Sequence, residues 1–575
     1  MERIALLQSR ESRSDEPAGW SITPRCELWL APSLQAVSDP VAHLAEAVAS
    51  AASSLTDRPV ELPDLERPPK PEFGDYSTNA AMLLAPTLGE PPRQIAERLG
   101  EALTNQLAGD VERVDVAGPG FLNLFMSDAW LARAVAEGLA AGDSYGASGG
   151  GERTNVEFVS DNPTGPVTVA AGRHAAYGDS LCRILELAGN EVEREYYVND
   201  YGTQIERFAE SIRARAKGEE PPEDGYQGEY LAEVATQIEG AAEMEGGELA
   251  RRGVEIMLGS VSATLDRFGV HMDRFVHERE NHESGAVQRA LDRLEETQHV
   301  YPLDGAVWLR TTTFGDDKDR VLLRSNGEMT YFAGDIAYHA DKLERGYDRV
   351  IDIWGADHHG YRARTYASWK ALGGDPDRLE LLIMQLVNLL EGGRRAQMSK
   401  RAGTVVTLDE LIGDIGVDAT RWFLLQRSHD TTLDLDLELA RTQSQDNPVY
   451  YVQYAHARIA SILRKAGDQR VEAALAADVA SSSERLHPSA RALVKRLIEL
   501  PGEVTDAADR RAPHRMTTYT TEVAQDFSAF YRDCKVLGAA EEGGDEDLRI
   551  AMSELTRRVI ARGLDLLGVR APSEM

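Results

Sequence analysis

Residues 155–179, NVEFVSDNPTGPVTVAAGRHAAYGD, decide the fold of this chain. They predict a strand at about 154–160, a tight loop forced by two prolines and a glycine, and a helix at about 172–188 with apolar residues at helical spacing. A glycine and an asparagine end that helix, and a second strand is expected at about 191–198. The stretch is therefore a βαβ unit of a parallel sheet, whose ligands bind at the carboxyl ends of the strands.

Changes in composition and periodicity around this unit divide the chain into four parts. Prolines interrupt the first part, three consecutive glycines stand at 149–151, and a helical pattern fills the end of the chain. Strand-like runs return at 306–310, 319–324 and 350–354, and helices are expected over 408–425. The predicted parts are an extension of unknown role (1–38), an α+β domain (39–145), a parallel-sheet core with a helical insertion at about 202–300 (146–415) and an all-α domain (416–575).

The composition of the 575 residues is that of a globular protein, with 42% hydrophobic residues and a formal charge of −33. A uniformly acidic surface repels nucleic acid, so a nucleic-acid site would need a local basic face. The three cysteines, Cys26, Cys182 and Cys534, have no metal-ligand spacing and fit a reducing compartment. No apolar run approaches the roughly 18 residues that span a membrane, and the N-terminus does not read as a secretory signal. We therefore expect a cytoplasmic protein without a membrane segment.

A second informative stretch is 397–407, QMSKRAGTVVT, a basic loop that carries Lys400 and Arg401. A lysine ammonium is a compact charge suited to a phosphate group. The chain has neither a GxGxxG sequence after a strand nor a P-loop sequence, so dinucleotide binding and P-loop hydrolysis are not supported. Together, 155–179 and 397–407 resemble the two ATP-handling signatures of class I aminoacyl-tRNA synthetases. Their flanking residues narrow the resemblance to the arginyl-tRNA synthetases.

The resemblance implies an α/β multidomain fold, in which a Rossmann-type catalytic core with a helical insertion is joined by an α+β N-terminal domain and an all-α anticodon-binding domain. It implies a ligase that joins L-arginine to tRNA(Arg) through an arginyl-adenylate and releases AMP and pyrophosphate. ATP with Mg²⁺ is the expected cosubstrate, no protein-bound metal is expected, and the protein is expected to be a monomer. Two alternatives stay open here: a catalytically impaired relative that binds tRNA or regulates, and transfer of arginine to another acceptor.

The first signature departs from the family pattern, because Thr168-Val169-Ala170-Ala171 stands where the family has His-x-Gly-His. Thr168 keeps a hydroxyl, whereas Ala171 offers no side-chain donor, and loss of one donor in the transition state costs roughly 3–4 kcal/mol. His174 lies about one turn deeper in the helix and is the candidate replacement, with a partly buried structural histidine as the competing interpretation. The catalytic candidates are Lys400, Thr168 and His174.

The resemblance also assigns binding residues. A guanidinium has five donors in a rigid fork and needs carboxylate and amide oxygens around it. The residues expected to contact arginine are Glu157, Asn162, Tyr331 and Asp335. Those expected to contact ATP are Gly165, Gly172, Asp357, His358, Met398, Ser399 and Lys400. Those expected to contact tRNA are Tyr76, Asn79, Tyr451, Gln453, Tyr454, Arg458 and Arg515, although each aromatic residue could equally belong to a core.

Overall fold

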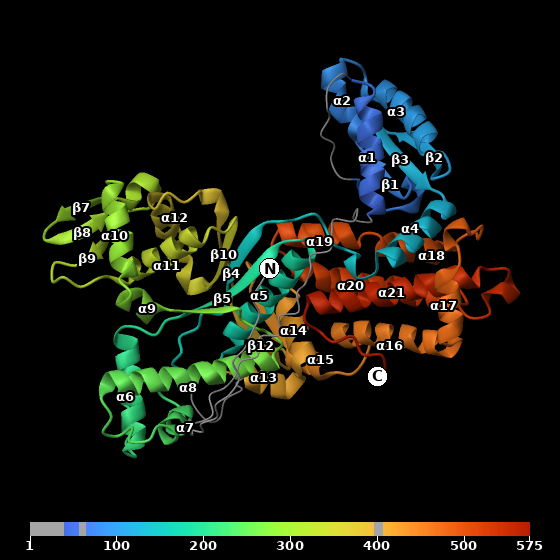
Figure 1. The fold of residues 1–575 in the computed structure, drawn as a ribbon. Coiled ribbons are helices and arrows are strands. Elements are labelled where there is room, and N and C mark those ends of the chain that lie inside the picture. Colours follow the sequence, from blue (N-terminus) through green and yellow to red (C-terminus); the bar gives the residue numbers. More distant parts are fainter. Residues whose placement is uncertain (1–38, 57–64, 396–405) are drawn as a thin grey trace, which may run out of the picture. The chain divides into compact units, whose positions relative to one another are not determined.

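A computed structural model describes residues 39–56, 65–395 and 406–575 (Figure 1). Within the described part, five parallel strands form the central sheet. In sheet order they are β11 (Leu379–Met384), β10 (Arg349–Gly355), β4 (Arg153–Glu157), β5 (Glu191–Val198) and β6 (Arg274–His277). The first of these strands in the chain, β4, lies in the middle, so the strand order reverses between β4 and β10. In sheets of this kind the ligand crevice lies outside the carboxyl ends of the strands at such a reversal.

The βαβ unit predicted from the sequence is present. Helix α5 (Val169–Leu187) starts three residues before the predicted helix, and β5 has the predicted bounds. Strand β4 ends at Glu157, before the predicted end at 160, because Val159 (φ 69°) and Ser160 (φ 40°) adopt left-handed backbone conformations. Because residues with this left-handed backbone cannot continue a strand, the chain turns after Glu157 at the carboxyl edge of the sheet.

The stretch predicted as a helical insertion contains five helices and also returns one strand, β6, to the central sheet. The helices are α6 (Thr203–Ala216), α7 (Tyr230–Gln237), α8 (Gly246–Arg267), α9 (Glu278–Glu283) and α10 (Ala286–Glu296). Helices α6, α7 and α8 enclose an apolar core of their own. Because β6 leads directly into α9, this insertion delivers the start of α9 to the carboxyl edge of the sheet.

The runs predicted as strands at 306–310 and 319–324 are strands, but they do not join the parallel sheet. They form a separate antiparallel sheet of β7 (Val300–Leu303), β8 (Ala306–Leu309) and β9 (Arg320–Leu323). Helix α11 (Tyr331–Arg345) follows this sheet, packs against α10 and leads into β10. Helix α12 (Arg362–Ala371) then connects β10 to β11.

A third small sheet follows β11 in the chain, and the helices predicted over 408–425 lie between its second and third strands. The sheet consists of β13 (Arg394–Arg395), β12 (Val387–Glu391) and β14 (Leu433–Asp436), and the helices are α13 (Leu408–Ile415) and α14 (Val417–Leu425). Helix α13 begins with a capping box in which Thr407 and Glu410 satisfy each other's main-chain N–H groups. Helices α13 and α14 both pack against α5, which places residues 406–408 beside the start of α5.

The N-terminal region described by the structure is an α+β unit, as predicted. Its elements are α1 (Pro40–Ser53), β1 (Tyr76–Thr78), α2 (Ala80–Leu88), α3 (Pro92–Gln106), β2 (Val111–Ala117), β3 (Phe121–Met126) and α4 (Asp128–Ala141). The three strands form an antiparallel sheet with β3 in the middle.

From Leu437 onward the C-terminal region is helical, as predicted. Its helices are α15 (Leu437–Arg441), α16 (Pro448–Ala466), α17 (Asp468–Ala476), α18 (Pro488–Leu497), α19 (Leu500–Asp509), α20 (His514–Asp533) and α21 (Glu546–Leu566). The part predicted to be all-α from 416 onward also contains strand β14, because Leu433 and Leu435 alternate with exposed aspartates and pair with β12. Helices α16, α20 and α21 run side by side in Figure 1 and pack against one another. Among the described helices, none combines the length and apolar character needed to cross a bilayer.

Candidate active site at the reversal point of the parallel sheet

A strained turn at the end of β4 fixes the first candidate residue, Glu157. The left-handed backbone at Val159 is costly for a β-branched residue and is kept only where the surroundings enforce it. Ser160 supplies part of that enforcement, because its Oγ donates to Glu157 Oε1 at 3.0 Å and accepts from the main-chain N–H of Tyr197 at 3.1 Å. The turn therefore ties the Glu157 carboxylate to the neighbouring strand β5.

The other residues expected to contact arginine come to the same edge from different elements. Tyr331 is the first residue of α11 and is 54% exposed, and Asp335 lies one turn further along. Asp335 is close enough to Glu157 for the charge of Glu157 to oppose ionisation of Asp335 and raise its pKa. Asn162, in the loop after β4, is exposed and its amide oxygen accepts from Asn199 Nδ2 at 3.1 Å.

Two residues that the sequence reasoning missed complete this group. Glu278, at the start of α9, is only 4% exposed, and its Oε1 would lie 3.5 Å from a Cβ placed on Gly334, the neighbour of Asp335. The hydroxyl of Tyr197 is buried and has no hydrogen-bond partner in the described structure. Neither Glu278 nor Asp335 forms an ion pair with a lysine or arginine of the described residues; Glu278 Oε1 lies 3.9 Å from Nε2 of His282, whose pKa is lowered by burial. An acidic pocket in which two carboxylates have no paired lysine or arginine is suited to a cationic ligand.

The carboxylates in this pocket are held partly protonated. Burial raises the pKa of Asp335 to about 6. Burial, with the nearby carboxylates of Asp335 and Asp200, raises the pKa of Glu278 to about 8. A bound guanidinium would favour the ionised form of both groups, so binding of such a ligand would release protons.

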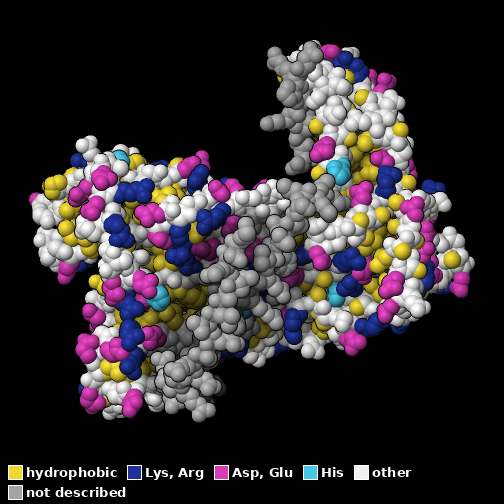
Figure 2. Space-filling view, viewed as in Figure 1, with side chains coloured by type: hydrophobic (Ala, Val, Ile, Leu, Met, Phe, Trp, Pro, Cys, Tyr) yellow, Lys and Arg dark blue, Asp and Glu magenta, His cyan; other side chains and the backbone are white. Residues whose placement is uncertain are grey.

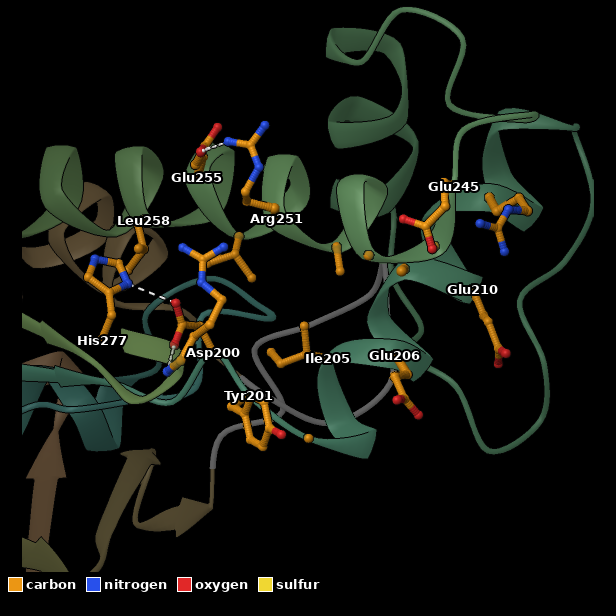
Figure 3. A pocket seen from close by; sticks show the side chains of 18 residues that line it. Asp200, Tyr201, Ile205, Glu206, Glu210, Glu245, Arg251, Glu255, Leu258 and His277 are labelled. Carbon is orange, nitrogen blue, oxygen red and sulfur yellow. Dashed lines mark hydrogen bonds and ion pairs between the residues drawn. The ribbon is translucent and has the colours of Figure 1, made fainter. Parts of the chain in front are cut away.

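A cavity of about 730 Å³ adjoins this pocket between α6, α8 and β6 (Figure 3). Asp200 stands at its inner end, where it accepts from His277 Nδ1 at 2.8 Å and from the main-chain N–H of Arg279 at 3.0 Å. Gly202 links the two spaces, because a Cβ at this position would lie 2.8 Å from the hydroxyl of Tyr331. None of the residues predicted from the sequence lines this cavity.

The start of α5 offers fewer free donors than the sequence suggested. Thr168 is the N-cap, and its Oγ1 accepts from the main-chain N–H of Ala171 at 3.1 Å. The N–H of Val169 donates to the carbonyl oxygen of Val406 at 3.1 Å. Two of the first three N–H groups of α5 are thus used by the protein itself. A phosphate at this helix start would need donors from other residues.

The glycines predicted to contact ATP lie close to other elements. A Cβ on Gly172 would lie 2.7 Å from Leu408 Cδ1, so this glycine allows α5 and α13 to approach each other. Gly165 lies in the loop before α5, where the hydroxyl of Tyr230 donates to the carbonyl oxygen of Thr164 at 2.7 Å. The remaining predicted residues of the second signature, Met398, Ser399 and Lys400, lie outside the described residues.

His174 faces the crevice between β4 and β10. Its Cε1 would lie 3.9 Å from a Cβ placed on Gly355, the last residue of β10. Burial, with the neighbouring charge of Arg173, lowers the pKa of His174 to about 4, so the ring is neutral at pH 7. Neither ring nitrogen forms a hydrogen bond with a described residue. Asp357 and His358, which follow β10 and are exposed, are close enough to influence the His174 pKa.

In the N-terminal domain, Tyr76 does not present its ring to a nucleic acid. It is buried in the core, with its ring against Trp130 at a centroid separation of 6.2 Å. The predicted stacking role for Tyr76 is therefore not supported, since alternation along β1 turns this side chain inward. Asn79 is half-buried, and its Oδ1 has no hydrogen-bond partner in the described structure.

Several residues predicted to contact tRNA in the C-terminal domain are used for packing. The amide nitrogen of Gln453 donates to Asp418 Oδ2 at 3.0 Å and to the carbonyl oxygen of Arg570 at 2.9 Å. Arg515 pairs with Glu503 and Asp506, and the hydroxyl of Tyr451 lies 3.1 Å from Ser528 Oγ. These interactions explain why polar residues at these positions face neighbouring helices.

Tyr454 and Arg458 instead belong to an open group of side chains, the aromatic–arginine cluster, which consists of Tyr450, Tyr454, Arg458 and Tyr531. The rings of Tyr450 and Tyr454 are nearly parallel, with centroids 6.3 Å apart. The guanidinium of Arg458 lies 5.1 Å from the ring centroid of Tyr454 and 5.3 Å from that of Tyr531. Tyr531 and Arg458 are exposed, whereas Tyr450 and Tyr454 are half-buried. Aromatic rings at the surface beside an arginine are suited to unstacked bases.

Three family models match the chain. The arginyl tRNA synthetase N terminal domain matches residues 42–126, the catalytic domain of class I (R) tRNA synthetases matches 229–458, and the DALR anticodon binding domain matches 452–575. The matched residues of the catalytic domain begin after the βαβ unit that carries the altered first signature.

Solved structures give the same result. A Campylobacter jejuni protein provisionally described as an arginyl-tRNA synthetase is 33% identical, with coverage of 78% of this chain and all of that chain and a TM-score of 0.72. The Thermus thermophilus arginyl-tRNA synthetase is 26% identical. The match covers 93% of this chain and 100% of that chain, with a TM-score of 0.74. The Plasmodium falciparum arginyl-tRNA synthetase shares the fold at 17% identity. The match covers 93% of this chain and 99% of that chain, with a TM-score of 0.73. The chain therefore belongs to the arginyl-tRNA synthetase family of class I aminoacyl-tRNA synthetases.

Proposed function

We propose that this protein joins L-arginine to tRNA(Arg) at the expense of ATP, through an arginyl-adenylate. The observation that carries the proposal is the acidic pocket at the carboxyl edge of the sheet, where the half-buried Asp335 and the buried Glu278 lack a lysine or arginine partner among the described residues. A guanidinium is permanently charged and planar, and it can satisfy both carboxylates at once.

In this proposal, Asp335 and Glu278 bind the guanidinium and Tyr331 covers its plane, while Glu157 and Asn162 hold the α-amino end of the substrate. The arginine carboxylate then attacks the α-phosphorus of ATP, and pyrophosphate leaves. A terminal ribose hydroxyl of tRNA next attacks the adenylate carbonyl, and AMP leaves. The protein contributes positioning and charge stabilisation, without a covalent enzyme intermediate.

The ATP would lie at the reversal point between β4 and β10, beside the start of α5. His174, Asp357 and His358 are its proposed contacts in the described part, and Lys400 and its neighbours are proposed from the sequence. Magnesium would enter as the ATP complex; among the described residues no group of three or more His, Cys, Asp or Glu side chains forms a metal site. The monomeric state and cytoplasmic location expected from the sequence stay predictions.

Charging of purified tRNA with labelled amino acids, in the presence of ATP and Mg²⁺, tests the proposal. We expect arginine to be attached and citrulline, which has the same shape without the charge, to be rejected by a factor of about 10⁴ because it would leave the carboxylates unpaired. Binding of tRNA without attachment of arginine would identify a catalytically impaired relative instead. Attachment of arginine to a different acceptor in the same assay would contradict the proposed acceptor.

The raised pKa values of Asp335 and Glu278 predict a pH dependence of arginine binding. Both groups bind a guanidinium as carboxylates, so the KM for arginine should fall as the pH rises from 6 to 8.5, through the pKa of Glu278 at about 8. Steady-state charging at saturating ATP and tRNA measures this profile. Glu278→Gln should flatten its upper part, and a wild-type KM that is constant or increases with pH would contradict the prediction.

The aromatic–arginine cluster predicts where the C-terminal domain contacts tRNA. Tyr454→Ala and Arg458→Ala should each weaken tRNA binding by about 5- to 100-fold, because loss of one stacked base costs about 1–3 kcal/mol. Fluorescence anisotropy with labelled tRNA at fixed ionic strength measures the affinity. Arg532→Ala is the matched control, since Arg532 is exposed on the same helix as Tyr531 but pairs with Asp533. If Arg532→Ala weakens binding as much as Arg458→Ala, the effect at Arg458 reflects a general loss of positive charge, and an unchanged affinity in Tyr454→Ala would contradict base stacking on the cluster.

A further inference from the structure

Three carboxylates lie side by side beneath the proposed arginine site. Glu195 on β5, Glu157 on β4 and Asp352 on β10 occupy paired positions of three adjacent strands and point to the same face of the sheet. All three are buried, and like charges on neighbouring strands destabilise a sheet. A cation must therefore compensate them inside the protein.

Lys342 of α11 is the cation that lies among all three carboxylates, and Arg345 of the same helix also pairs with Glu195. Its Nζ lies 2.8 Å from Glu157 Oε2, 2.7 Å from Asp352 Oδ1 and 3.9 Å from Glu195 Oε1, and its side chain is completely buried. Burial opposes protonation of Lys342, but Asp352 and Glu157 outweigh it and raise the lysine pKa above its ordinary value. Among the described residues, Lys342 is the sole lysine or arginine that forms an ion pair with Glu157.

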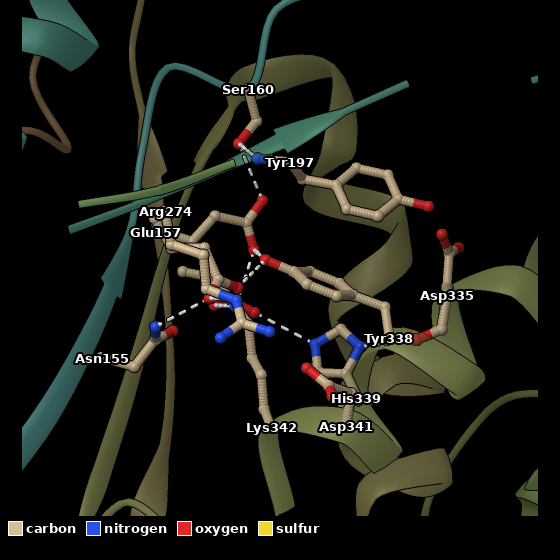
Figure 4. A network of polar contacts seen from close by, with 12 residues as sticks. Asn155, Glu157, Ser160, Tyr197, Arg274, Asp335, Tyr338, His339, Asp341 and Lys342 are labelled. Carbon is tan, nitrogen blue, oxygen red and sulfur yellow. Dashed lines mark hydrogen bonds and ion pairs between the residues drawn. The ribbon is translucent and has the colours of Figure 1, made fainter. Parts of the chain in front are cut away.

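Two further side chains of α11 join this arrangement (Figure 4). The hydroxyl of Tyr338 lies 2.9 Å from Glu157 Oε2 and 2.5 Å from Glu195 Oε1, and its single hydrogen can be donated to only one of them at a time. His339 lies between Asp352 Oδ2, 3.0 Å from its Nε2, and the main-chain carbonyl oxygen of Asp335, 2.8 Å from its Nδ1. Both ring nitrogens face acceptors, so the ring is best satisfied as an imidazolium. The network thus links Glu157 to the helical turn that carries Asp335.

The two carboxylate oxygens of Glu157 have different partners. Oε2 accepts from Lys342 and lies beside the Tyr338 hydroxyl, which Glu157 shares with Glu195, whereas Oε1 accepts only from Ser160 among the described residues and faces the strained turn. Without Lys342, Glu157 would lose its cation and Oε2 would lose its shortest contact. The carboxylate would then rotate or protonate, and Oε1 would no longer be fixed for a substrate.

We propose that Lys342 is a positioning residue for arginine recognition: by holding Glu157 and Asp352 together it fixes Glu157 and, through His339, the α11 turn that carries Asp335. The inference rests on the proposed function, because it assigns these residues to arginine. A displacement of about 1 Å at a binding group can lower the rate by about 100-fold, so a positioning residue can matter as much as a contact.

The test compares the KM for arginine with the KM for ATP. Lys342→Met should raise the arginine KM by about 10- to 100-fold and change the ATP KM by less than about twofold. Lys342→Arg, which keeps the charge, should recover part of the loss. If Lys342→Met does not fold, Lys342→Met/Asp352→Asn removes one cation and one anion together and should show the same selective increase. Thermal unfolding verifies that each variant is folded.

Arg345→Met is the matched control. Arg345 lies on the same helix and pairs with Glu193 and Glu195 instead of Glu157, so its loss should lower stability and leave the arginine KM within about twofold. Equal increases of both KM values in the Lys342 variants, or the same increase in Arg345→Met, would show a merely structural lysine and overturn the inference.

Calorimetric titration of the folded variants with arginine separates this inference from the proposed function. If the wild type binds arginine but does not charge tRNA, the proposed function fails, and the affinities of the Lys342 and Arg345 variants still decide the role of Lys342. If the wild type does not bind arginine in the presence or absence of tRNA, both are overturned.

Discussion

Asp335→Asn is expected to raise the KM for arginine by about 100- to 1000-fold while the KM for ATP stays within about twofold. Truncating one partner of a buried, hydrogen-bonded charge pair costs about 2–5 kcal/mol, and each 1.4 kcal/mol is a factor of ten. Asp335 meets the conditions for a large effect, because it is half-buried without a lysine or arginine ion-pair partner among the described residues and burial already raises its pKa to about 6. The asparagine keeps the shape of the side chain, so the loss reports the charge.

Asp341→Asn provides the comparison. Asp341 lies on the same helix, but its carboxylate is partly exposed and pairs with Arg345 Nε at 2.9 Å. Steady-state charging with arginine varied at saturating ATP and tRNA measures both variants. An unchanged arginine KM in Asp335→Asn, or an equal change in Asp341→Asn, would remove Asp335 from the arginine site and leave Glu278 as the group to test.

The elements that could be predicted from the sequence are those whose causes are local. Helix α5 and strand β5 follow from apolar spacing and from the glycine and asparagine between them, and their observed bounds are close to the predicted ones. Glu157, Asn162, Tyr331 and Asp335 could be assigned because each stands in a motif that can be recognised from its neighbours in the chain. Whether these four residues contact arginine stays a prediction.

Glu278 and Lys342 could not be predicted in this way, because their roles depend on elements far apart in the chain. Glu278 reaches the pocket because β6 joins the parallel sheet, and no local pattern in a mostly helical insertion indicates that pairing. Lys342 reads as one charged residue on an amphipathic helix until β4 and β10 place Glu157 and Asp352 on either side of it. Burial of a charge is a tertiary property, and a single sequence does not contain it explicitly.

The residues predicted to contact tRNA differ in another way. Their residue types could be recognised from the sequence, but whether each side chain faces solvent or the protein interior could not. Tyr76 and Gln453 have side chains that can bind bases. The ring of Tyr76 is buried in a core, however, and the amide of Gln453 binds α16 to Asp418 and Arg570. Tyr454 and Arg458 are also residue types that can bind bases, and they remain half-buried and exposed, respectively. Only the direction of each side chain on its strand or helix distinguishes the two cases.

His174→Ala is expected to lower the kcat for charging by about 100-fold, with little change in arginine KM or tRNA affinity. Thr168 uses its hydroxyl as an N-cap, Ala171 has no donor, and the N–H of Val169 is bonded to Val406. His174 faces the crevice beside Gly355 with no hydrogen bond to a described residue, and burial keeps its ring neutral. A neutral imidazole has one N–H, and removal of a donor to a developing charge lowers kcat by about 100- to 1000-fold.

His174→Gln tests whether the donor itself matters, since the amide keeps an N–H of similar reach. If His174 donates to the phosphates, the glutamine variant should retain more activity than the alanine variant, and both should bind arginine and tRNA normally. A kcat that is the same in the wild type and in His174→Ala would assign His174 to packing. The transition-state charge would then have to be stabilised by the remaining main-chain donors at the start of α5, by the hydroxyl hydrogen of Thr168, whose oxygen accepts from Ala171, and by the sequence-predicted Lys400.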